Sequence, residues 1–493
     1  MALVRKSAPN LATVHKPFPY QSEAFVAIRD LEYSAVFHEQ GLGKTKIAID
    51  VALHWLEHQI VDSVVIVTKK GLVANWQKEF RIHTKVKPKV FTGDRADNHY
   101  SFHSTSPFFI THYEAVKSEA ERFELFAKSR RIGMILDEAH KIKNPEANIT
   151  HAFHELAPLF NKRLILTGSP IANRPYDLWA QVWFLDQGAA LGHDFRKFKS
   201  MLDIPRDESS SASQGLGVDV FEDELGQLFP KIKPFSVRET KDTAGIHLPS
   251  KHYRQVTARF ESDQRKMYEA IRDEMRLEVL KDGLIEEDVS DDLLKRLLRL
   301  VQVASNPALV DERYIAEPGK VQPLCELVGK ISANGEKVII WTSFVDNVGW
   351  LAKLFNEYCP VRVHGGMAMK DRQRSIDAFL EEPPVKVLIA TPQSAKEGLT
   401  LTVANHVIFY DRTFSLDDYI QAQDRIHRIS QERDCYVYNL TIEDSIDGWT
   451  NTLIEAKQAA ASYGQGDIEY EEYRRKMRYD VASELRSVLG IED

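Results

Sequence analysis

Residues 34–50 read SAVFHEQGLGKTKIAID, and this stretch is the strongest indication of the fold. It begins with a short apolar run, residues 35–37, suited to a buried strand, and a glycine-rich turn follows at residues 40–45. From Lys46 onward, apolar residues recur with helical spacing. In a strand–turn–helix unit of this kind, backbone N–H groups and the positive end of the helix dipole point at phosphate oxygens. The stretch therefore predicts a phosphate-binding loop in an α/β domain.

Two polar residues of this loop have specific expected roles. Lys44 would contact the β- and γ-phosphates of a nucleoside triphosphate, and the hydroxyl of Thr45 would bind magnesium. The full pattern for such a loop has glycine six positions before the lysine, where this chain has His38. Taken alone, the segment is also compatible with a glycine-rich turn before a surface helix, so a second feature has to decide.

That second feature lies about ninety residues further along the chain. Residues 131–136 (RIGMIL) form an apolar run that predicts a strand buried in a parallel sheet. Asp137 and Glu138 follow at its carboxyl end, where open α/β sheets bind ligands. We expect Asp137 to hold magnesium, directly or through water, and Glu138 to orient or deprotonate the attacking water. Two acids at a strand end often serve only as helix-terminal charges, but together with the upstream loop they indicate hydrolysis of a nucleoside triphosphate.

Composition sets broad limits on the protein. Its 493 residues suffice for two or three domains, and 43% hydrophobic and 28% charged residues are ordinary for a globular enzyme. The three cysteines lack metal-ligand spacing and suit a reducing compartment. The sequence has neither an apolar run that spans a bilayer nor a secretory signal, so we expect no membrane partner. We expect a cytoplasmic location (bacterial or viral, nucleoid-associated), or a nuclear one in a eukaryote. The net charge of −8 does not exclude nucleic acid, because local charge decides such binding.

Strand-like and helix-like stretches alternate in two regions, which predicts two parallel sheets with crossover helices. The predicted strands comprise residues 63–68, 108–111, 132–136 and 163–167 in the first region, and residues 251–260, 337–342, 361–364, 385–390 and 406–410 in the second. We also expect helices at residues 262–281 and 292–305 and beyond Asp444, and a loop at residues 209–217, which are rich in serine and glycine. The expected domains comprise residues 1–245, 246–450 and 451–493.

The second region carries its own candidate functional segment, residues 419–431 (YIQAQDRIHRISQ). Arg425 and Arg428 are three residues apart, so a helix would present both on one face. Two such arginines can neutralise charge that develops on a γ-phosphate. A surface helix with a salt-bridge network is the alternative for this segment taken alone.

The ordered set of segments resembles the SWI/SNF-like family of superfamily-two helicase-like ATPases over about residues 15–450. The resemblance is carried by residues 19–21 (adenine-reading element), 40–45 (motif I), 64–68 with 72–80 (Ia), 110–114 (Ib), 137–144 (II), 166–170 (III), 338–344 (IV), 394–402 (V) and 421–431 (VI). Residues 237–241, 248–249 and 306–307 look like the landmarks that flank the two helical protrusions of this family. The sequence departs from the common pattern at His38, Thr400, Phe414 and Ser430. These departures bear on the subfamily to which the chain would be assigned more than on its activity.

The resemblance implies an α/β fold with two tandem RecA-like parallel-sheet lobes, helical protrusions and a C-terminal helical brace. It implies ATP and magnesium as cofactors, with Thr45 and Asp137 as metal ligands, and catalytic roles for Lys44, Asp137, Glu138, Arg425 and Arg428. The implied nucleotide contacts are Gln21, Gln40, Gly41, Leu42, Gly43, Lys44, Thr45, Lys46 and Gly398. The implied contacts to DNA phosphates and sugars are Lys69, Asn75, Thr111, Tyr113, Ser343, Thr391 and Lys396. We expect Trp76 and Trp341 in the core, and His140 either coupling the site to motif III or simply hydrogen-bonded.

The functional prediction is a DNA-dependent ATPase that translocates on double-stranded DNA and remodels forks, branched junctions or bound proteins. Its expected partners are duplex or branched DNA and, as a further option, a nuclease or a replication or recombination protein. One alternative is a helicase that separates strands of DNA or RNA. Another alternative is an ATP-gated motor subunit of a nuclease or defence complex, in which hydrolysis switches partner affinity.

Overall fold

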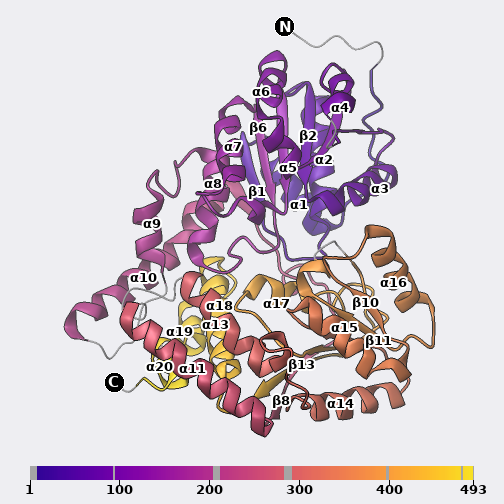
Figure 1. The fold of residues 1–493 in the computed structure, drawn as a ribbon. Coiled ribbons are helices and arrows are strands. Elements are labelled where there is room, and N and C mark those ends of the chain that lie inside the picture. Colours follow the sequence, from indigo (N-terminus) through magenta and orange to yellow (C-terminus); the bar gives the residue numbers. More distant parts are fainter. Residues whose placement is uncertain are drawn as a thin grey trace. The chain divides into compact units, whose positions relative to one another are not determined.

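The computed structural model describes residues 8–92, 95–203, 211–282, 291–395, 399–478 and 481–491, and these form two compact units (Figure 1). The first unit contains the chain up to Asp203 together with Asp219–His247 and Ala460–Tyr470. The second contains Leu248–Ala459, the residues from Glu471 onward and the described residues just before Asp219. The C-terminal tail, which we expected to be one segment, is therefore divided between the two units.

The first unit is built on a seven-stranded sheet in which every strand pairs in parallel with its neighbours. Its order is β3-β4-β2-β5-β6-β1-β7. The strands are β1 (Tyr33–Val36), β2 (Ser63–Thr68), β3 (Lys89–Val90), β4 (Phe108–His112), β5 (Ile132–Asp137), β6 (Lys162–Leu166) and β7 (Ser236–Val237). The predicted strands are confirmed to within two residues at their ends. Strands β3 and β7, which have two residues each, were not predicted.

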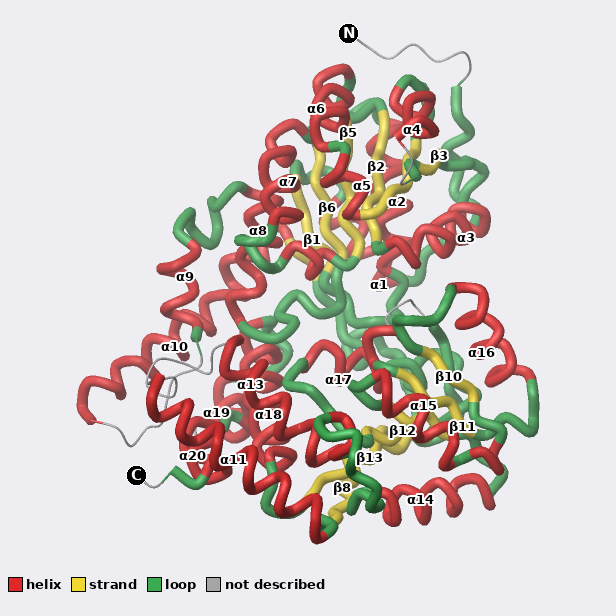
Figure 2. Tube along the Cα trace, viewed as in Figure 1, coloured by secondary structure: helices red, strands yellow, loops and turns green. Residues whose placement is uncertain are grey.

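Helices surround this sheet (Figure 2) and bury its apolar strands. The helices of this unit are α1 (Pro19–Ile28), α2 (Lys44–Glu57), α3 (Val73–His83), α4 (Arg95–Phe102), α5 (Tyr113–Ser118), α6 (Ala120–Ser129), α7 (Asn148–Leu156), α8 (Leu178–Asp186), α9 (Phe195–Leu202) and α10 (Ser211–Ile232), with short 3-10 turns η1 (Lys70–Leu72), η2 (Ala139–Ile142), η3 (Ala157–Leu159), η4 (Pro175–Asp177) and η5 (Lys233–Phe235). Helices α9 and α10 lie away from the sheet, and the first turns of α10 belong to the second unit (Figure 2). The expected loop at residues 209–217 is wrong for residues 211–217, which are the first turns of α10; residues 209–210 lie outside the described part. Burial of Phe221, Leu225 and Leu228 further along α10 outweighs the weak helix propensity of the serines and glycines.

The second unit has a six-stranded parallel sheet in the order β10-β11-β9-β12-β13-β8. Its strands are β8 (Lys251–Ala258), β9 (Val338–Trp341), β10 (Val361–Val363), β11 (Val387–Ala390), β12 (His406–Phe409) and β13 (Cys435–Ile442). Its helices are α11 (Ser262–Asp282), α13 (Asp291–Ser305), α14 (Val321–Ala333), α15 (Val345–Leu354), α16 (Met369–Glu381), α17 (Leu416–Gln423), α19 (Tyr470–Lys476) and α20 (Val481–Leu489), with short turns η6 (Pro307–Leu309), η7 (Asn356–Tyr358) and η8 (Pro392–Ala395). The remaining helix, α18 (Ile446–Gly464), begins in this unit and ends in the first.

The fold prediction of two parallel α/β sheets with additional helices is confirmed, and so are the two helices of the protrusion, α11 and α13. Strand β13 was missed, although it pairs with β8 along its whole length and with β12 over residues 436–439. Within the described residues, no helix combines the length and the apolar character needed to cross a membrane.

Candidate functional site

The phosphate loop joins β1 to α2 in a conformation that requires glycine. Gly41 has φ +91° and Gly43 has φ +69°, in the left-handed region that other residues rarely adopt. A side chain at Gly43 would also collide with the amide of Gln21, which donates from Nε2 to the carbonyl of Leu42 at 3.1 Å. The predicted adenine-reading residue therefore lies directly on the loop, at the N-terminus of α2.

Lys44 lies at the centre of the loop. Its Nζ donates to the carbonyl oxygens of His38 (2.8 Å) and Glu39 (3.3 Å). Burial lowers the pKa of Lys44, and the nearby carboxylates of Glu138 and Asp137 oppose that shift. A Cβ at Gly168, in the turn after β6, would lie 3.2 Å from Lys44 Nζ, so this turn closes on the lysine. The structure therefore brings motifs I, II and III together within the first unit.

Asp137, the last residue of β5, is held by two hydrogen bonds. Its Oδ2 accepts from Thr68 Oγ1 at 2.8 Å and from Trp76 Nε1 at 2.7 Å. Burial raises the pKa of Asp137, and the negative charge of Glu138 adds to the rise, while the two hydrogen bonds oppose it. The carboxylate thus depends on its donors to remain charged.

Glu138 has a strained backbone and a strongly stabilised charge. Its φ of +56° is unusual for a residue other than glycine, and such strain concentrates at functional sites. Burial alone would raise the pKa of Glu138, but His140, Lys69 and Lys44 outweigh burial and lower it. His140 Nδ1 lies 3.2 Å from Glu138 Oε2, and His140 Nε2 lies 2.9 Å from Lys69 Nζ. His140 is thus a hydrogen-bonded residue, the second of the two alternatives, and it links Glu138 to Lys69.

The residues at the loop suit magnesium held together with a triphosphate. A hydroxyl and a carboxylate, from Thr45 and Asp137, are hard oxygen ligands of the kind that magnesium prefers. The half-buried Thr45 hydroxyl makes no hydrogen bond to another described residue. No group of three or more His, Cys, Asp and Glu side chains in the described ranges has the geometry of a metal site. A metal bound there through these two residues would take its remaining ligands from phosphate oxygens or water.

The predicted nucleic-acid contacts of the first unit fall into two groups. Asn75 is exposed on α3, and Lys69 is half-buried beside His140. Thr111 and Tyr113 are fully buried, and the hydroxyl of Tyr113 donates to the carbonyl of Asp137 at 2.9 Å. We therefore correct the prediction that these two side chains contact DNA: Tyr113 supports the end of β5 instead.

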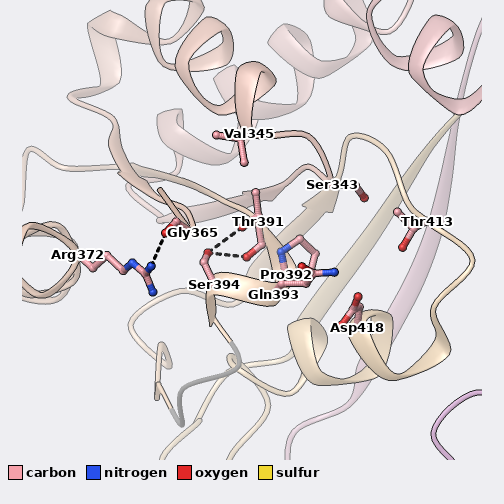
Figure 3. A pocket seen from close by; sticks show the side chains of 10 residues that line it. All are labelled: Ser343, Val345, Gly365, Arg372, Thr391, Pro392, Gln393, Ser394, Thr413 and Asp418. Atoms are coloured by element: carbon pink, nitrogen blue, oxygen red, sulfur yellow. Dashed lines mark hydrogen bonds between the residues drawn. The ribbon is translucent and has the colours of Figure 1, made fainter. Parts of the chain in front are cut away.

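In the second unit, two predicted contacts line one cavity of about 360 Å³ (Figure 3). Ser343 follows β9 and Thr391 follows β11, so both lie at the carboxyl edge of the sheet. The backbone N–H of Ser343 donates to Asp411 Oδ1 at 2.6 Å, and Thr391 Oγ1 bonds Ser394 Oγ at 3.0 Å. Arg372 Nη2 donates to the carbonyl of Gly365 at 2.7 Å, and Gly365 lies beside Thr391 in the lining of the cavity (Figure 3). Two further predicted residues, Lys396 and Gly398, lie outside the described residues.

Arg425 and Arg428 do not share a helix face, so that prediction is wrong. Helix α17 ends at Gln423, and both arginines lie in the turns that follow. Beyond the helix, the backbone N–H of Leu401 donates to the carbonyl of Arg425 at 2.9 Å. Arg425 is buried, with Nη1 3.4 Å from the carbonyl of Leu399, and Arg428 Nη1 donates to Thr400 Oγ1 at 2.8 Å.

Sequence reasoning missed the residues that hold the functional groups in place. The hydrogen bonds of Thr68 and Trp76 to Asp137 join residues 69 and 61 positions apart. Trp76 is 1% exposed, so the prediction that it is a core residue is confirmed, but its indole N–H has a polar role as well. Asp411, behind Ser343, was also missed. The available signal was the polar end of Trp76, since a buried tryptophan N–H needs an acceptor.

A strand–loop–helix phosphate site, an acidic pair at the end of β5, two strands away in the same parallel sheet, and a second parallel-sheet unit together define a helicase-type ATPase. The family model described as "SNF2-related domain" matches residues 33–309, more than half of the chain, and the "Helicase conserved C-terminal domain" matches residues 319–430. The chain therefore belongs to the SNF2-related family of superfamily-two ATPases, and the resemblance drawn from its motifs is confirmed.

The chain is similar to proteins from several kingdoms. It is 24% identical over 464 residues to the ATP-dependent DNA helicase DDM1 of Arabidopsis thaliana, covering 88% of this chain and 59% of that protein. It is 25% identical over 461 residues to the DNA repair and recombination protein RAD54-like of Homo sapiens, covering 83% and 60%. A solved Sulfolobus solfataricus SWI2/SNF2 ATPase core in complex with dsDNA is 24% identical, with a TM-score of 0.42 and coverage of 96% and 99%. The chain spans 36–60% of the length of the curated relatives it matches.

Proposed function

We propose that this protein is a DNA-dependent ATPase that translocates on double-stranded DNA, remodelling forks and branched junctions or displacing bound proteins. One observation carries the proposal: a single helix, α3, has a catalytic contact on one face and a basic surface on the other. On the inner face, Trp76 donates to Asp137 at 2.7 Å. On the outer face, Lys78 and Arg81 are exposed, one helical turn apart.

The basic surface is larger than α3 itself. Residues 69–89 contain seven lysines and arginines and one glutamate, a net charge of +6, which leaves −14 for the rest of the chain. Six of these basic side chains are exposed, and none forms an ion pair with a described residue; we call them the α3 basic surface: Lys70, Lys78, Arg81, Lys85, Lys87 and Lys89. Concentrated, unpaired positive charge on an acidic protein favours a polyanion such as a nucleic-acid backbone.

The form of nucleic acid follows from which side chains are accessible. Binding of single strands relies on exposed aromatic rings on which bases stack. In the described segments where we predicted nucleic-acid contacts, Trp76, Tyr113 and Trp341 are each at most 1% exposed. Lysine, arginine, asparagine and serine remain accessible there, and these side chains grip phosphates and sugars. This composition supports a backbone grip on duplex DNA.

The proposal gives each residue of the nucleotide site a task, and the contacts described above support it. The N–H groups of residues 41–45 and the ammonium of Lys44 would hold the triphosphate. Glu138, whose charge is stabilised, would accept a proton from the attacking water or orient it. Magnesium bound through Thr45 and Asp137 would neutralise charge on the phosphates. Arg425 and Arg428 keep their proposed role of stabilising charge on the γ-phosphate.

The test compares steady-state ATP hydrolysis without nucleic acid and with single-stranded DNA, duplex DNA, a branched junction and RNA, using Glu138→Gln as the blank. We expect the strongest stimulation with duplex or branched DNA. Stimulation only by single strands or RNA, with efficient unwinding of a forked duplex, would overturn the proposal in favour of a strand-separating helicase. Indifference to every nucleic acid, together with a co-purifying protein, would favour a motor subunit of a larger complex.

The α3 basic surface can be tested separately. We expect Lys78→Glu/Arg81→Glu to weaken duplex binding and to reduce the slope of log affinity against log salt by about 2, since two phosphate contacts are lost. A matched control is Lys330→Glu/Lys353→Glu, which reverses two exposed charges on α14 and α15 of the second unit. Equal salt slopes for the two double variants would show that α3 does not contact the DNA.

A further inference from the structure

The first arm of the phosphate loop, residues 37–39, is held by two cations. Lys44 Nζ donates to the carbonyls of His38 and Glu39, and Arg238 Nη1 donates to the carbonyl of Phe37 at 2.7 Å. A triphosphate would compete with these carbonyls for the three N–H donors of the lysine. Arg238 holds the arm independently of Lys44, through the carbonyl of Phe37.

Arg238 belongs to residues 237–241, a segment that we call the strap and that lies along the arm with backbone hydrogen bonds between them. The N–H of Phe37 donates to the carbonyl of Val237 at 2.8 Å, and the N–H of Glu39 donates to the carbonyl of Glu239 at 2.8 Å. The strap ends at Lys241, whose Nζ pairs with Glu39 Oε1 at 2.9 Å. The position of the strap therefore sets the position of the arm.

The guanidinium of Arg238 is oriented by a residue far away in the sequence. Arg238 Nε and Nη2 each donate to a carboxylate oxygen of Asp467 at 2.5 Å. Both side chains are largely buried, with 12% and 20% of their surface exposed. A bidentate pair fixes the plane of the guanidinium as well as its distance, so Asp467 aims Nη1 at the carbonyl of Phe37.

Asp467 is itself fixed on the first unit, directly after α18. Gly466 has φ +74°, and a Cβ there would lie 2.7 Å from the ring of Phe229 on α10. The hydroxyl of Tyr470 donates to Glu222 on α10 at 2.8 Å. The turn that carries Asp467 is thus clamped on α10, although α18 starts in the second unit.

We infer that Asp467 is a positioning residue for the phosphate loop, and that it sets the affinity for the nucleoside triphosphate through Arg238. This inference rests on the proposed function only in that the loop must bind ATP. The nucleotide site of this chain is therefore completed by the segment after α18, which is part of neither predicted sheet domain. Asp467 touches neither nucleotide nor DNA, and its effect is on the geometry of the residue 37–39 arm.

The experiment measures binding of a fluorescent ATP analogue with magnesium to the full chain, alongside KM and kcat for ATP and the urea-induced unfolding of each variant. Asp467→Asn removes the charge and keeps the shape, and Asp467→Glu restores the charge. The control is Asp62→Asn. Asp62 forms the same kind of bidentate pair with Arg131, which also donates to a backbone carbonyl, that of Gln59, but at the amino edge of the sheet.

We expect Asp467→Asn to weaken analogue binding and raise KM about tenfold while kcat changes less than twofold, and Asp467→Glu to recover part of the affinity. Asp62→Asn should lower stability to a similar extent and leave binding and KM unchanged. Wild-type affinity in Asp467→Asn, or an equal loss of affinity in Asp62→Asn, would overturn the inference. If the wild-type chain fails to bind the analogue, the proposed function fails instead, so the two failures are distinguishable.

Discussion

The contact between Trp76 and Asp137 yields the sharpest prediction for turnover. Trp76→Phe keeps a buried aromatic ring but removes the N–H that donates to Asp137 Oδ2 at 2.7 Å. Asp137 retains one donor, Thr68, at 2.8 Å. A hydrogen bond to a charged group contributes about 1.5–3 kcal/mol. Because its loss falls on a carboxylate that is already costly to keep charged, we expect about 2 kcal/mol of it to appear in the activation barrier.

At about 1.4 kcal/mol for each factor of ten, this corresponds to a fall in kcat of roughly 30-fold. The assay is steady-state ATP hydrolysis at saturating ATP and magnesium, with and without duplex DNA. DNA binding in the absence of nucleotide, measured by fluorescence anisotropy, should change little, because Trp76 is buried and the basic face of α3 is untouched.

Trp55→Phe is the matched control. Trp55 is fully buried in the same unit, and its Nε1 donates at 2.8 Å to a backbone carbonyl, that of Arg29, remote from the carboxylates. Both variants should lose about 1–3 kcal/mol of unfolding free energy, but only Trp76→Phe should lose turnover. A kcat within twofold of wild type for Trp76→Phe, or an equal loss for Trp55→Phe, would refute the reasoning.

Three further predictions concern stability and the second unit. Burial lowers the pKa of His154 to about 4, so between pH 6.5 and 4 this histidine binds a proton in the unfolded state and stays neutral in the folded state. The free energy of unfolding should therefore fall by about 3 kcal/mol as the pH drops from 6.5 to 4. Urea titrations should show a smaller fall for His154→Gln. Asp411→Asn should weaken DNA binding several-fold in anisotropy measurements, because Asp411 holds the N–H of Ser343 at 2.6 Å; unchanged binding would separate Ser343 from the DNA path. Lys320→Met should cost about 3–5 kcal/mol in urea unfolding, because it leaves Asp447 buried without the ammonium now 2.7 Å away, and a loss below 1 kcal/mol would contradict that.

The fold was predictable where a strand is buried on both faces, because such a strand has a continuous apolar sequence. Strand β2 was predicted at its observed bounds because a central parallel strand is a continuous apolar run. The edge strands β3 and β7 were not predicted because a two-residue strand is too short to show a periodic pattern. The N-terminal part of α10 was mistaken for a loop because its composition is local, whereas the packing that holds the helix lies further along the chain.

The sequence allowed the reacting groups of the site to be predicted, but not the residues that hold those groups in place through hydrogen bonds. Lys44, Asp137 and Glu138 follow from spacing, because a phosphate loop and a strand-end acidic pair have few alternative uses together. Thr68 and Trp76 reach Asp137 only through the pairing of β2 with β5 and the return of α3, which no local pattern contains. Tyr113 was misassigned for the same reason: its segment was recognised correctly, but the direction of its side chain is set by tertiary packing.

The carboxylates and the phosphate loop of the nucleotide site are held by two different parts of the chain, α3 and the turn after α18. This arrangement bears on how the proposed motor is controlled. The carboxylate half depends on α3 through Trp76, and the opposite face of α3 carries basic charge suited to DNA. The phosphate-loop half depends on Asp467, directly after a helix that starts in the second unit. A signal from DNA would therefore act on hydrolysis, and a signal along α18 would act on nucleotide affinity. Lys44 faces both halves, because its ammonium donates to the loop carbonyls and lies near the carboxylates of Glu138 and Asp137. Coupling between the two signals would therefore be transmitted at this group, for whose three N–H donors the loop carbonyls and the phosphates would compete.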